Sequence, residues 1–372
     1  MKIKKPYNFT ILIYLIMLAA LYMIGKEIIS IVSHGNIDSD NITSFTILTF
    51  ILGFLANSVL YIIGTVIGAK IGGYNIIAVN LFGIEFAFVN KKLIVHFAGY
   101  EGFSGDVKVA LNEKKSKHNA LPMFLGGFVM MLILIVSAVT YYVVVYKTDY
   151  NAIFVCGFLF FATIALALLF YNLLPVRTDS LTDGIKIKSY KKSKESFNEL
   201  TRIQGELANN QPLKGVKLCE KEITTLNSEL YYMAYLENIY AHNYVEAEKI
   251  IDQLIESSTI TSLSIYQTLL PAKVFTLIKN KTKEEVLAYI ETLSQREKQI
   301  LLAPQCIEGI RCYVALNSYI YDNMYSFNKG VSQFMKEIEK TIYIGNIEQQ
   351  KNTIIEMVEE TKKEKPEWEI NY

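Results

Sequence analysis

The sequence contains few of the residues that mark several common protein classes. Only 4 of its 37 basic residues are arginines, and its formal net charge is +1. Nucleic-acid-binding proteins carry excess positive charge, and bidentate phosphate recognition depends on arginine, so we exclude a strongly basic nucleic-acid binder. Aromatic residues make up 12% of the chain, which excludes disorder over most of its length.

Cysteine and histidine are also scarce. The four cysteines form no CxxC pair, so we expect free thiols rather than a disulfide framework. The four histidines are far apart in sequence, and the chain contains no HExxH, no P-loop and no GxSxG motif. Asp38, Asp40 and Asn41 supply too few oxygen ligands for a calcium site and are interpreted as a solvated loop. The positions are Cys156, Cys219, Cys306 and Cys312, and His34, His96, His118 and His242.

Long apolar stretches are present, and they lie in one half of the chain. Four of them, at about 9–32, 45–69, 121–146 and 152–174, reach the roughly 20 residues that a helix needs to cross a bilayer. The first is longer than the apolar core of a signal peptide and is interpreted as an uncleaved helix. We therefore predict a multi-pass membrane domain over residues 1–178 that contacts the lipid bilayer.

The distribution of lysine and arginine predicts an orientation. The five segments before, between and after the four helices carry three, zero, six, one and six basic residues in turn. Basic residues concentrate in cytoplasmic loops. Both termini are therefore predicted to be cytoplasmic, with the protein in the cell membrane. The richness in Lys, Ile, Asn and Tyr is typical of an AT-rich bacterial genome.

The remaining segments predict a mostly α fold with a small β insert. Residues 75–98 are rich in β-branched and aromatic residues, and Asn90-Lys91-Lys92 between two such runs indicates a short β-hairpin or a small sheet on the cytoplasmic side. A charged linker at 179–195 is predicted to lead into an all-α cytoplasmic domain at 196–363. Its helical pairs, such as 226–242 with 245–257, favour a solenoid of tetratricopeptide-like hairpins. Residues 364–372 are predicted to form a loose tail.

The second apolar segment carries polar and small residues at membrane depth. Asn57, Tyr61 and Thr65 are spaced i, i+4, i+8 and therefore lie on one helical face. Gly64 and Gly68 form a GxxxG pair, which allows helices to approach closely. This candidate face is open to two interpretations, a packing surface or the lining of a buried cavity.

These features together resemble the site-2 protease family of intramembrane zinc metalloproteases. Asn172 and Pro175 end the fourth apolar segment, and Asp179 and Asp183-Gly184 follow, the latter read as a turn. This NxxP…DG ending is similar to that of the family's last core helix. In the same register, residues 61–74 resemble the first core helix and Gly126-Gly127 the start of the next. The family-site positions are then Tyr61, Ile62, Thr65, Met131, Asn172 and Asp183.

The departures from the family pattern argue against zinc chemistry. A catalytic zinc needs three protein ligands and an open position for water. In the family register Tyr61 and Thr65 replace the two histidines, Ile62 replaces the glutamate base, and only Asp183 is kept. The resemblance thus implies a degenerate member with no metal, no cofactor and no catalytic residue.

We therefore predict a non-catalytic membrane protein that binds or scaffolds a peptide or protein partner through the cytoplasmic helical domain. Its role would lie in peptide processing, export or immunity. One alternative is an active, divergent metalloprotease with displaced ligands, to be sought at Asp183, His96 and His118. Another is an accessory subunit of a membrane transporter, which would pack against its partner through Gly64 and Gly68.

Overall fold

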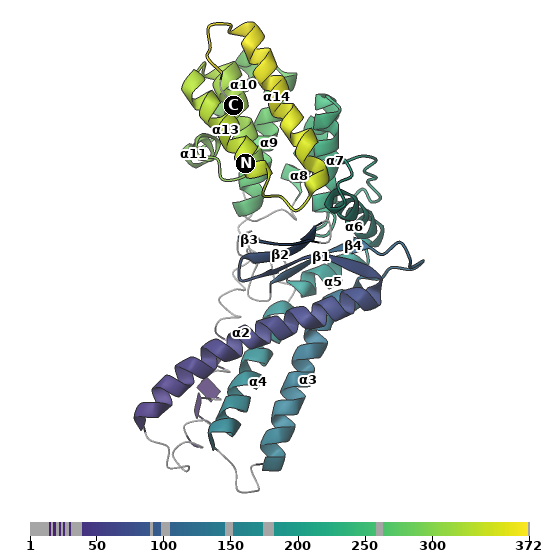
Figure 1. The fold of residues 1–372 in the computed structure, drawn as a ribbon, viewed down its shortest axis with the longest axis vertical. Helices are drawn as coiled ribbons and strands as arrows, with labels where there is room; N and C mark the ends of the chain where they lie inside the picture. The colour runs from purple at the N-terminus through teal and green to yellow at the C-terminus, as the bar shows by residue number, and fades with distance from the viewer. Residues whose placement is uncertain are drawn as a thin grey trace. The chain divides into compact units, whose positions relative to one another are not determined.

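The protein divides into two compact units. A computed structural model describes residues 39–89, 92–97, 105–145, 152–173, 182–257 and 263–370, together with isolated positions between 15 and 30. One unit comprises mainly residues 192–372, and the other comprises residues 6–88 and 92–191. We call them the helical unit and the apolar unit. Both are built largely from helices, and the only sheet in the described ranges belongs to the apolar unit (Figure 1).

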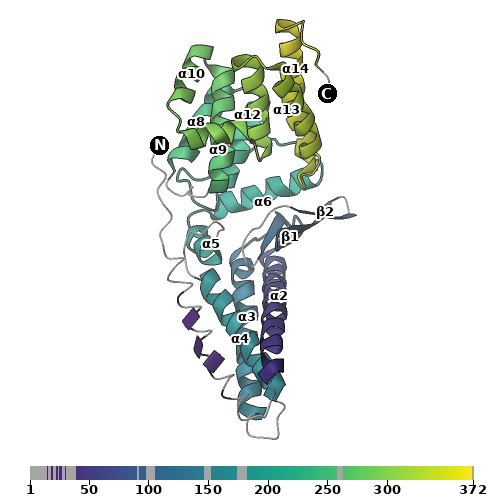
Figure 2. The same cartoon turned by 90° about the vertical axis from the view of Figure 1, so that its left-hand side faces the viewer.

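Three apolar helices form the body of the apolar unit (Figure 2). They are α2 (Ser39–Gly72), α3 (Leu121–Val145) and α4 (Ala152–Leu173), and each contacts the other two. Two of them, over Ile47–Gly72 and Leu121–Val144, are long and apolar enough to cross a membrane, whereas the apolar stretch of α4 is shorter, at Gly157–Leu173. The predicted helix at 9–32 lies outside the continuously described residues. Asp40 and Asn41, expected in a loop, lie in the first turn of α2.

A four-stranded antiparallel sheet follows α2. Its strands are β1 (Tyr74–Leu81), β2 (Ile84–Val89), β3 (Lys92–Phe97) and β4 (Asp106–Leu111), in the order β3-β2-β1-β4. Of the two predicted forms of the insert at 75–98, a hairpin or a small sheet, the structure has the sheet, and the insert contains three of its four strands. Sequence reasoning missed the Phe82-Gly83 turn, where both residues have positive φ, and also the short strand β4. The predicted turn at 90–92 falls mainly on residues outside the description.

Part of the predicted linker is a packed helix. Residues Asp183–Tyr190 form α5, and Asp183-Gly184, read as a turn, opens its first turn instead. Tyr190 anchors α5 to the start of α3, because its hydroxyl accepts a hydrogen bond from the Ala120 backbone N–H at 2.9 Å. Its ring also packs edge-on against Phe124. Burial of Ile185 and Tyr190 explains why a segment with two lysines folds here. Pro175 and Asp179 lie outside the described residues.

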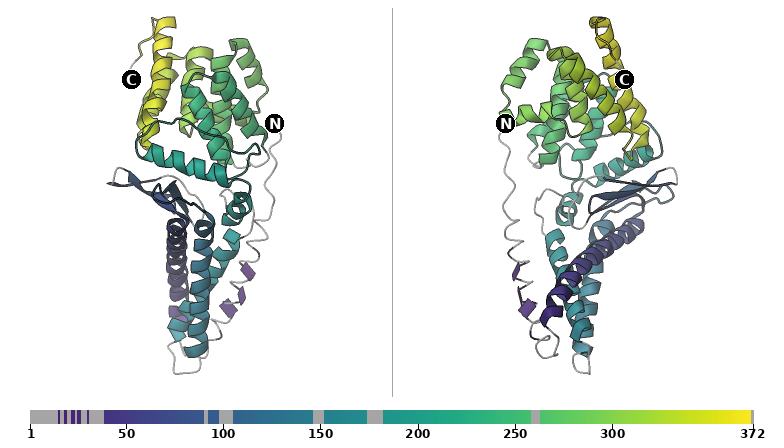
Figure 3. Two further views of the ribbon diagram at one scale, coloured as in Figure 1. Left: turned by 90° about the vertical axis from the view of Figure 1, so that its right-hand side faces the viewer. Right: turned by 60° about the vertical axis from the view of Figure 1, so that its left-hand side comes forward.

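All the regular secondary structure of residues 192–370, the main part of the helical unit, is helical where the structure describes it (Figure 3). Its predicted helical pairs are present, and the sequence missed α11, which is short and mostly polar. Consecutive neighbours α7 and α8, α8 and α9, and α12 and α13 pack together, and α9 also packs on α12. The helices are α6 (Lys194–Ala208), α7 (Ser228–Tyr240), α8 (Tyr244–Glu256), α9 (Leu263–Asn280), α10 (Lys283–Glu291), α11 (Gln295–Leu302), α12 (Ile307–Ala315), α13 (Met324–Ile338) and α14 (Ile347–Glu364), with a π turn η1 (Leu316–Ile320) and a 3₁₀ turn η2 (Ile344–Asn346).

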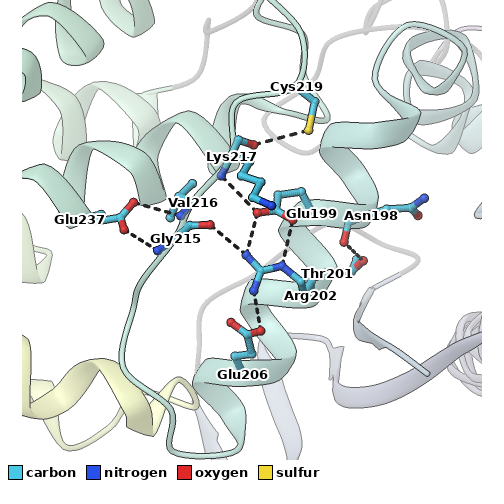
Figure 4. Close-up of polar contacts among 10 residues, drawn as sticks. All are labelled: Asn198, Glu199, Thr201, Arg202, Glu206, Gly215, Val216, Lys217, Cys219 and Glu237. Carbon is cyan, nitrogen blue, oxygen red and sulfur yellow. Dashed lines mark hydrogen bonds and ion pairs between the residues drawn. The ribbon is translucent and has the colours of Figure 1, made fainter. Parts of the chain in front are cut away.

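Hydrogen bonds from side chains fix the loop between α6 and α7 (Figure 4). Arg202 donates to Glu199 and Glu206 on its own helix and to the Gly215 carbonyl at 3.1 Å. Glu237 of α7 accepts from the backbone N–H groups of Gly215 and Val216. These bonds pair backbone groups of a long loop that lacks the regular backbone hydrogen bonds of a helix or a sheet.

The C-terminal residues are packed rather than loose. Trp368 meets Phe327 edge-on, with ring centroids 5.8 Å apart, and the Lys365 ammonium lies 4.4 Å from the Trp368 ring centroid. Both Trp368 and Ile370 pack against the core of the helical unit. A large aromatic side chain in the final segment provided the apolar area for this contact, which the polar composition of residues 364–372 concealed.

Candidate functional site

Two residues at the family-site positions meet in the apolar unit. Tyr61 of α2 and Asp183 of α5 are both buried, and the Tyr61 hydroxyl donates a 2.6 Å hydrogen bond to Asp183 Oδ2. Gly127 of α3 provides the space for the tyrosine ring, since a Cβ there would lie 2.4 Å from it. A residue from the second apolar segment and one from beyond the fourth therefore share one polar contact.

Lys186 completes this contact with a positive charge. Its Nζ lies 3.3 Å from Asp183 Oδ1 and 3.1 Å from Asp106 Oδ1 of β4. The i, i+3 spacing on α5 puts Lys186 on the same side as Asp183. Burial raises the pKa of Asp183, although Lys186 and Tyr61 oppose that rise. Burial also raises the pKa of Asp106, but Lys186 and Lys108 outweigh it and hold that pKa below its usual value.

A second charged group lies on the adjacent strands. Glu85 of β2 is 2% exposed, and its carboxylate pairs with Lys108 of β4 at 2.6 Å and with His96 of β3 at 3.3 Å. The strand register places this group beside Asp106, because Glu85 and Asp106 lie on either side of Asn80 of β1 and both pair with it. Acidic and basic side chains therefore alternate from the sheet to α5, and each named carboxylate contacts a lysine.

The predicted polar face of α2 is packed against neighbouring helices. Asn57 Nδ2 donates to the Gly53 carbonyl at 2.8 Å and to the Phe161 carbonyl of α4 at 3.2 Å. The Thr65 hydroxyl bonds back to the Tyr61 carbonyl at 3.1 Å. Asn57 and Tyr61 therefore contact different helices, α4 and α5, despite their shared face.

The GxxxG residues bring α2 and α3 together at the backbone. A Cβ at Gly64 would lie 2.3 Å from the Gly126 carbonyl oxygen, and one at Gly68 would lie 1.9 Å from that of Pro122. Gly126 is equally constrained, since its Cβ would lie 2.1 Å from the Gly64 carbonyl oxygen. In the described structure these glycines form a contact within the chain.

The other family-site positions have structural contacts. Ile62 is buried and approaches Gly105, where a Cβ would lie 2.6 Å from its Cδ1. Met131 is fully buried in the cluster that contains Tyr61, and Asn172 Nδ2 donates to the Leu168 carbonyl at 3.0 Å. Sequence reasoning missed Lys186 and Asp106. Lys186 had a usable signal in its i, i+3 spacing from Asp183, whereas Asp106 depended on the unpredicted strand β4.

The arrangement offers little to a metal ion. No group of three or more His, Cys, Asp or Glu side chains with metal-binding geometry occurs in the described part of the chain. His96 pairs with Glu85, and the His118 ring stacks at a tilt against Tyr74, so neither joins Asp183. The Lys186 ammonium already supplies the positive charge facing Asp183 and would repel a cation placed there.

Comparison with known proteins yields no relative. No family model, no curated protein and no solved structure matches this chain.

Proposed function

We propose that the protein is a non-catalytic membrane protein, similar to an intramembrane metalloprotease, that binds a peptide or protein partner. The observation that carries this proposal is the hydrogen bond between Tyr61 and Asp183. The resemblance assigns metal-ligand positions to both residues, and they lie together, but one side chain is a phenol and Lys186 neutralises the other. Such a site favours a structural role over hydrolysis, because a phenol and a lysine-paired carboxylate do not provide the three protein ligands that hold a catalytic zinc and its water.

The outward side chains of α2 and α3 support a membrane location. In the most apolar stretch of each helix only 33% of the residues are buried, so both helices expose long apolar faces. A soluble monomer rarely exposes so large a contiguous apolar surface, whereas lipid tails would cover it. The exposed residues include Ile47, Leu48, Ile51, Leu52, Leu55, Val59 and Ile63 on α2, and Val129, Leu132, Ile133, Val136 and Val139 on α3. The lysine distribution favours cytoplasmic termini in a multi-pass protein of the cell membrane.

The helical unit is the proposed partner-binding part. Stacked helical hairpins create extended surfaces that proteins use to capture peptides or helices. The transporter-subunit alternative loses its main support, because Gly64 and Gly68 pack against α3 of the same chain. The active-protease alternative requires a metal beside Lys186.

Metal content measured by mass spectrometry tests the proposal. We expect far less than one zinc per wild-type chain after purification in detergent without a His tag. A rebuilt variant that combines Tyr61→His, Ile62→Glu, Thr65→His and Lys186→Met is expected to bind about one zinc per chain. The two introduced histidines and Asp183 would then supply three protein ligands. The same variant with Asp183→Ala is the matched control and should lose the metal. About one zinc in the wild-type chain would overturn the proposal.

A further inference from the structure

The helical unit contains a fully buried arginine that is incompletely paired. Arg311 of α12 is 0% exposed, and its Nη1 donates to Gln350 Oε1 of α14 at 3.0 Å. Its Nε and Nη2 have no hydrogen-bond partner among the described residues, and Glu308 lies 3.9 Å from Nη2, beyond hydrogen-bond distance. Burying a charge is costly unless it is paired and hydrogen-bonded, so this guanidinium lacks part of the compensation it needs.

The guanidinium is nevertheless held in place. Its carbon lies 5.0 Å from the centroid of the Phe275 ring of α9, a cation–π distance. Together with the Gln350 bond, this contact restrains the group from two sides. The edge carrying Nε and Nη2 is the one without a partner.

Three neighbouring residues also have buried polar atoms without a partner. They are the Tyr232 and Tyr240 hydroxyls of α7 and Oδ1 of Asn346 in η2. Burial raises the pKa of both tyrosines, and the nearby Glu308 carboxylate adds to the rise at Tyr232. The charge of Arg311 opposes the rise at both tyrosines, and the Asn346 side chain opposes it at Tyr240, so both hydroxyls are within the electrostatic reach of Arg311. We call Arg311, Tyr232, Tyr240 and Asn346 the Arg311 cluster.

This concentration of unpaired atoms indicates a ligand. Folded proteins leave only a few buried polar groups unpaired per hundred residues, and each needs an explanation. Here five such atoms belong to one cluster. Tyr232, Tyr240 and Glu308 are only partly buried, so the cluster lies close beneath the surface. We propose that the Arg311 cluster binds a carboxylate group, held on the Nε–Nη2 edge of Arg311 and by the hydroxyls of Tyr232 and Tyr240.

The chemistry of the cluster selects a carboxylate over other anions. Nε and Nη2 lie along one edge of a planar guanidinium, and their spacing matches the two oxygens of a carboxylate. Two phenol hydroxyls can donate to the same oxygens. Glu308, so close to Arg311, disfavours a dianion such as phosphate more than a singly charged carboxylate. This inference rests on the proposed function in taking the helical unit as the part that captures the partner.

The experiment is thermal unfolding of the full-length protein in detergent, followed by Trp368 fluorescence. Trp368 is the single tryptophan of the chain and packs on Phe327, so its signal reports on the helical unit. Sodium acetate should raise the unfolding temperature above its value in sodium chloride at equal ionic strength, because a ligand of the folded state stabilises it. Acetamide and phosphate should not. N-acetylalanine stands in for the carboxylate at the C-terminus of a peptide. If both acetate and N-acetylalanine raise the unfolding temperature, the ligand is a chain-terminal carboxylate; if acetate alone raises it, the ligand is a small free acid.

Single substitutions separate binding from folding. Tyr232→Phe and Tyr240→Phe should leave the unfolding temperature in chloride unchanged or higher, because each removes an unpaired buried hydroxyl. Each should raise the apparent dissociation constant for acetate about tenfold, the effect of losing one hydrogen bond to a charged group. Tyr235→Phe is the matched control. Its hydroxyl already donates to the Ala272 carbonyl at 3.1 Å, so this variant should unfold at a lower temperature and keep its response to acetate.

Two results would overturn the site. One is an acetate effect in the wild-type protein no larger than that of chloride. The other is a loss of stability in chloride for Tyr232→Phe and Tyr240→Phe like that of Tyr235→Phe, which would mean that both hydroxyls have structural partners. Either result leaves the proposed function standing, because the metal measurement concerns Tyr61 and Asp183 in the apolar unit. Zinc in the wild-type chain would overturn that function and not this site.

Discussion

The two units use opposite ways to hold their helices together. In the apolar unit, α2 and α3 meet backbone to backbone at Gly64, Gly68 and Gly126. The buried carboxylates of Glu85 and Asp183 both contact a lysine. In the helical unit, bulky side chains such as Tyr235, Phe275 and Phe327 fill the core, and a buried arginine retains unpaired donors.

This difference indicates where a ligand is needed. The polar groups around Asp183 are compensated by the protein itself, so they have little left to offer a metal or a substrate. Those around Arg311 are not, and a second molecule would complete them. We therefore place the proposed partner-binding chemistry in the helical unit and not at the contact between Tyr61 and Asp183.

The largest expected effect comes from separating α2 and α3. Gly68→Leu places a side chain where even a Cβ would lie 1.9 Å from the Pro122 carbonyl oxygen. Overpacking of this kind costs about 3 kcal/mol or more, so we expect a loss of folded, monodisperse protein. Size-exclusion chromatography and circular dichroism melts in detergent measure it.

Gly157→Ala on α4 is the matched control for that variant. Apart from the adjoining residues and the backbone of its own helix, no atom lies within 4 Å of a Cβ at this glycine, so the unfolding temperature of the variant should be unchanged or higher. Normal folding of Gly68→Leu in the purified chain would contradict the backbone contact and return Gly68 to a role in binding another subunit.

A smaller effect is expected from Lys186→Met. This change leaves Asp183 and Asp106 facing each other without a cation, and removing one partner of a buried ion pair is strongly destabilising. Because the Asp106 side chain is 32% exposed, we expect about 2 kcal/mol at pH 7 rather than the full cost of a dry pair. Chemical unfolding of both proteins in detergent measures the difference.

The loss in Lys186→Met should shrink in acid, since protonated carboxyls no longer repel each other. Lys188→Met, an exposed position on the same helix, is the control and should be near neutral. Adding Asp183→Asn to Lys186→Met should restore part of the stability. A variant as stable as the wild-type protein at pH 7 would mean that the lysine does not pair with these carboxylates in solution.

Tyr61→Phe is expected to cost about 1.5 kcal/mol, the usual loss when a hydrogen bond to a charged group is removed. The Tyr61 hydroxyl opposes the rise in the pKa of Asp183, so the variant should raise that pKa further. An aspartate with a raised folded-state pKa loses stability as pH increases from its unfolded value of 3.8 through the folded value. The cost of Tyr61→Phe should therefore be largest above the folded-state pKa, and below pH 3.8 it should fall to the smaller cost of losing a hydrogen bond to a neutral carboxyl.

A double-mutant cycle checks this contact. In an Asp183→Asn background, Tyr61→Phe should cost less, because the acceptor is no longer charged. Equal costs in both backgrounds would mean that Tyr61 and Asp183 do not interact, and would remove the observation on which the proposed function depends.

The sequence was most informative where its periodicity was strong. The apolar helices at 121–146 and 152–174 and the helical pairs of the second half follow their predicted ranges closely. Tyr61 and Asp183, which the family resemblance assigns to one site, are hydrogen-bonded in the structure, although the Asp183-Gly184 dipeptide begins a helix and does not form a turn. The sequence underestimated segments whose structure depends on distant contacts. Helix α5 requires Tyr190 to pack on α3, and Trp368 requires the core of the helical unit.

The candidate groups that the sequence missed share one property. Lys186, Asp106 and Lys108 look like ordinary loop charges, and the lysines were counted only as orientation signals. Lys186 had one local signal, its i, i+3 spacing from Asp183. The other contacts of these residues join strands and helices remote in sequence, so no local pattern could predict them. Arg311 is similar, since its burial depends on α7, α9 and α14 together.

The smallest effect concerns acid, and it distinguishes the carboxylates of the two units. Glu199, Glu248 and Glu360 of the helical unit are each partly buried, which raises their pKa. Hydrogen bonds and charges from Arg202, Lys273 and Lys279 nevertheless hold that pKa below the usual value of 4.5.

A carboxyl whose pKa is lower in the folded state than in the unfolded state contributes stability above the unfolded pKa, and this stability is lost as the pH falls through the folded pKa. The helical unit should therefore lose about 1 kcal/mol in total between pH 5 and pH 3, a modest sum because solvent screens these pairs. Trp368 fluorescence during denaturant unfolding measures it, and Glu248→Gln should reduce the pH dependence. A helical unit that becomes more stable as the pH falls from 5 to 3 would contradict this prediction. It would mean that carboxyls with a raised pKa, like that of Asp183, dominate the pH dependence there as well.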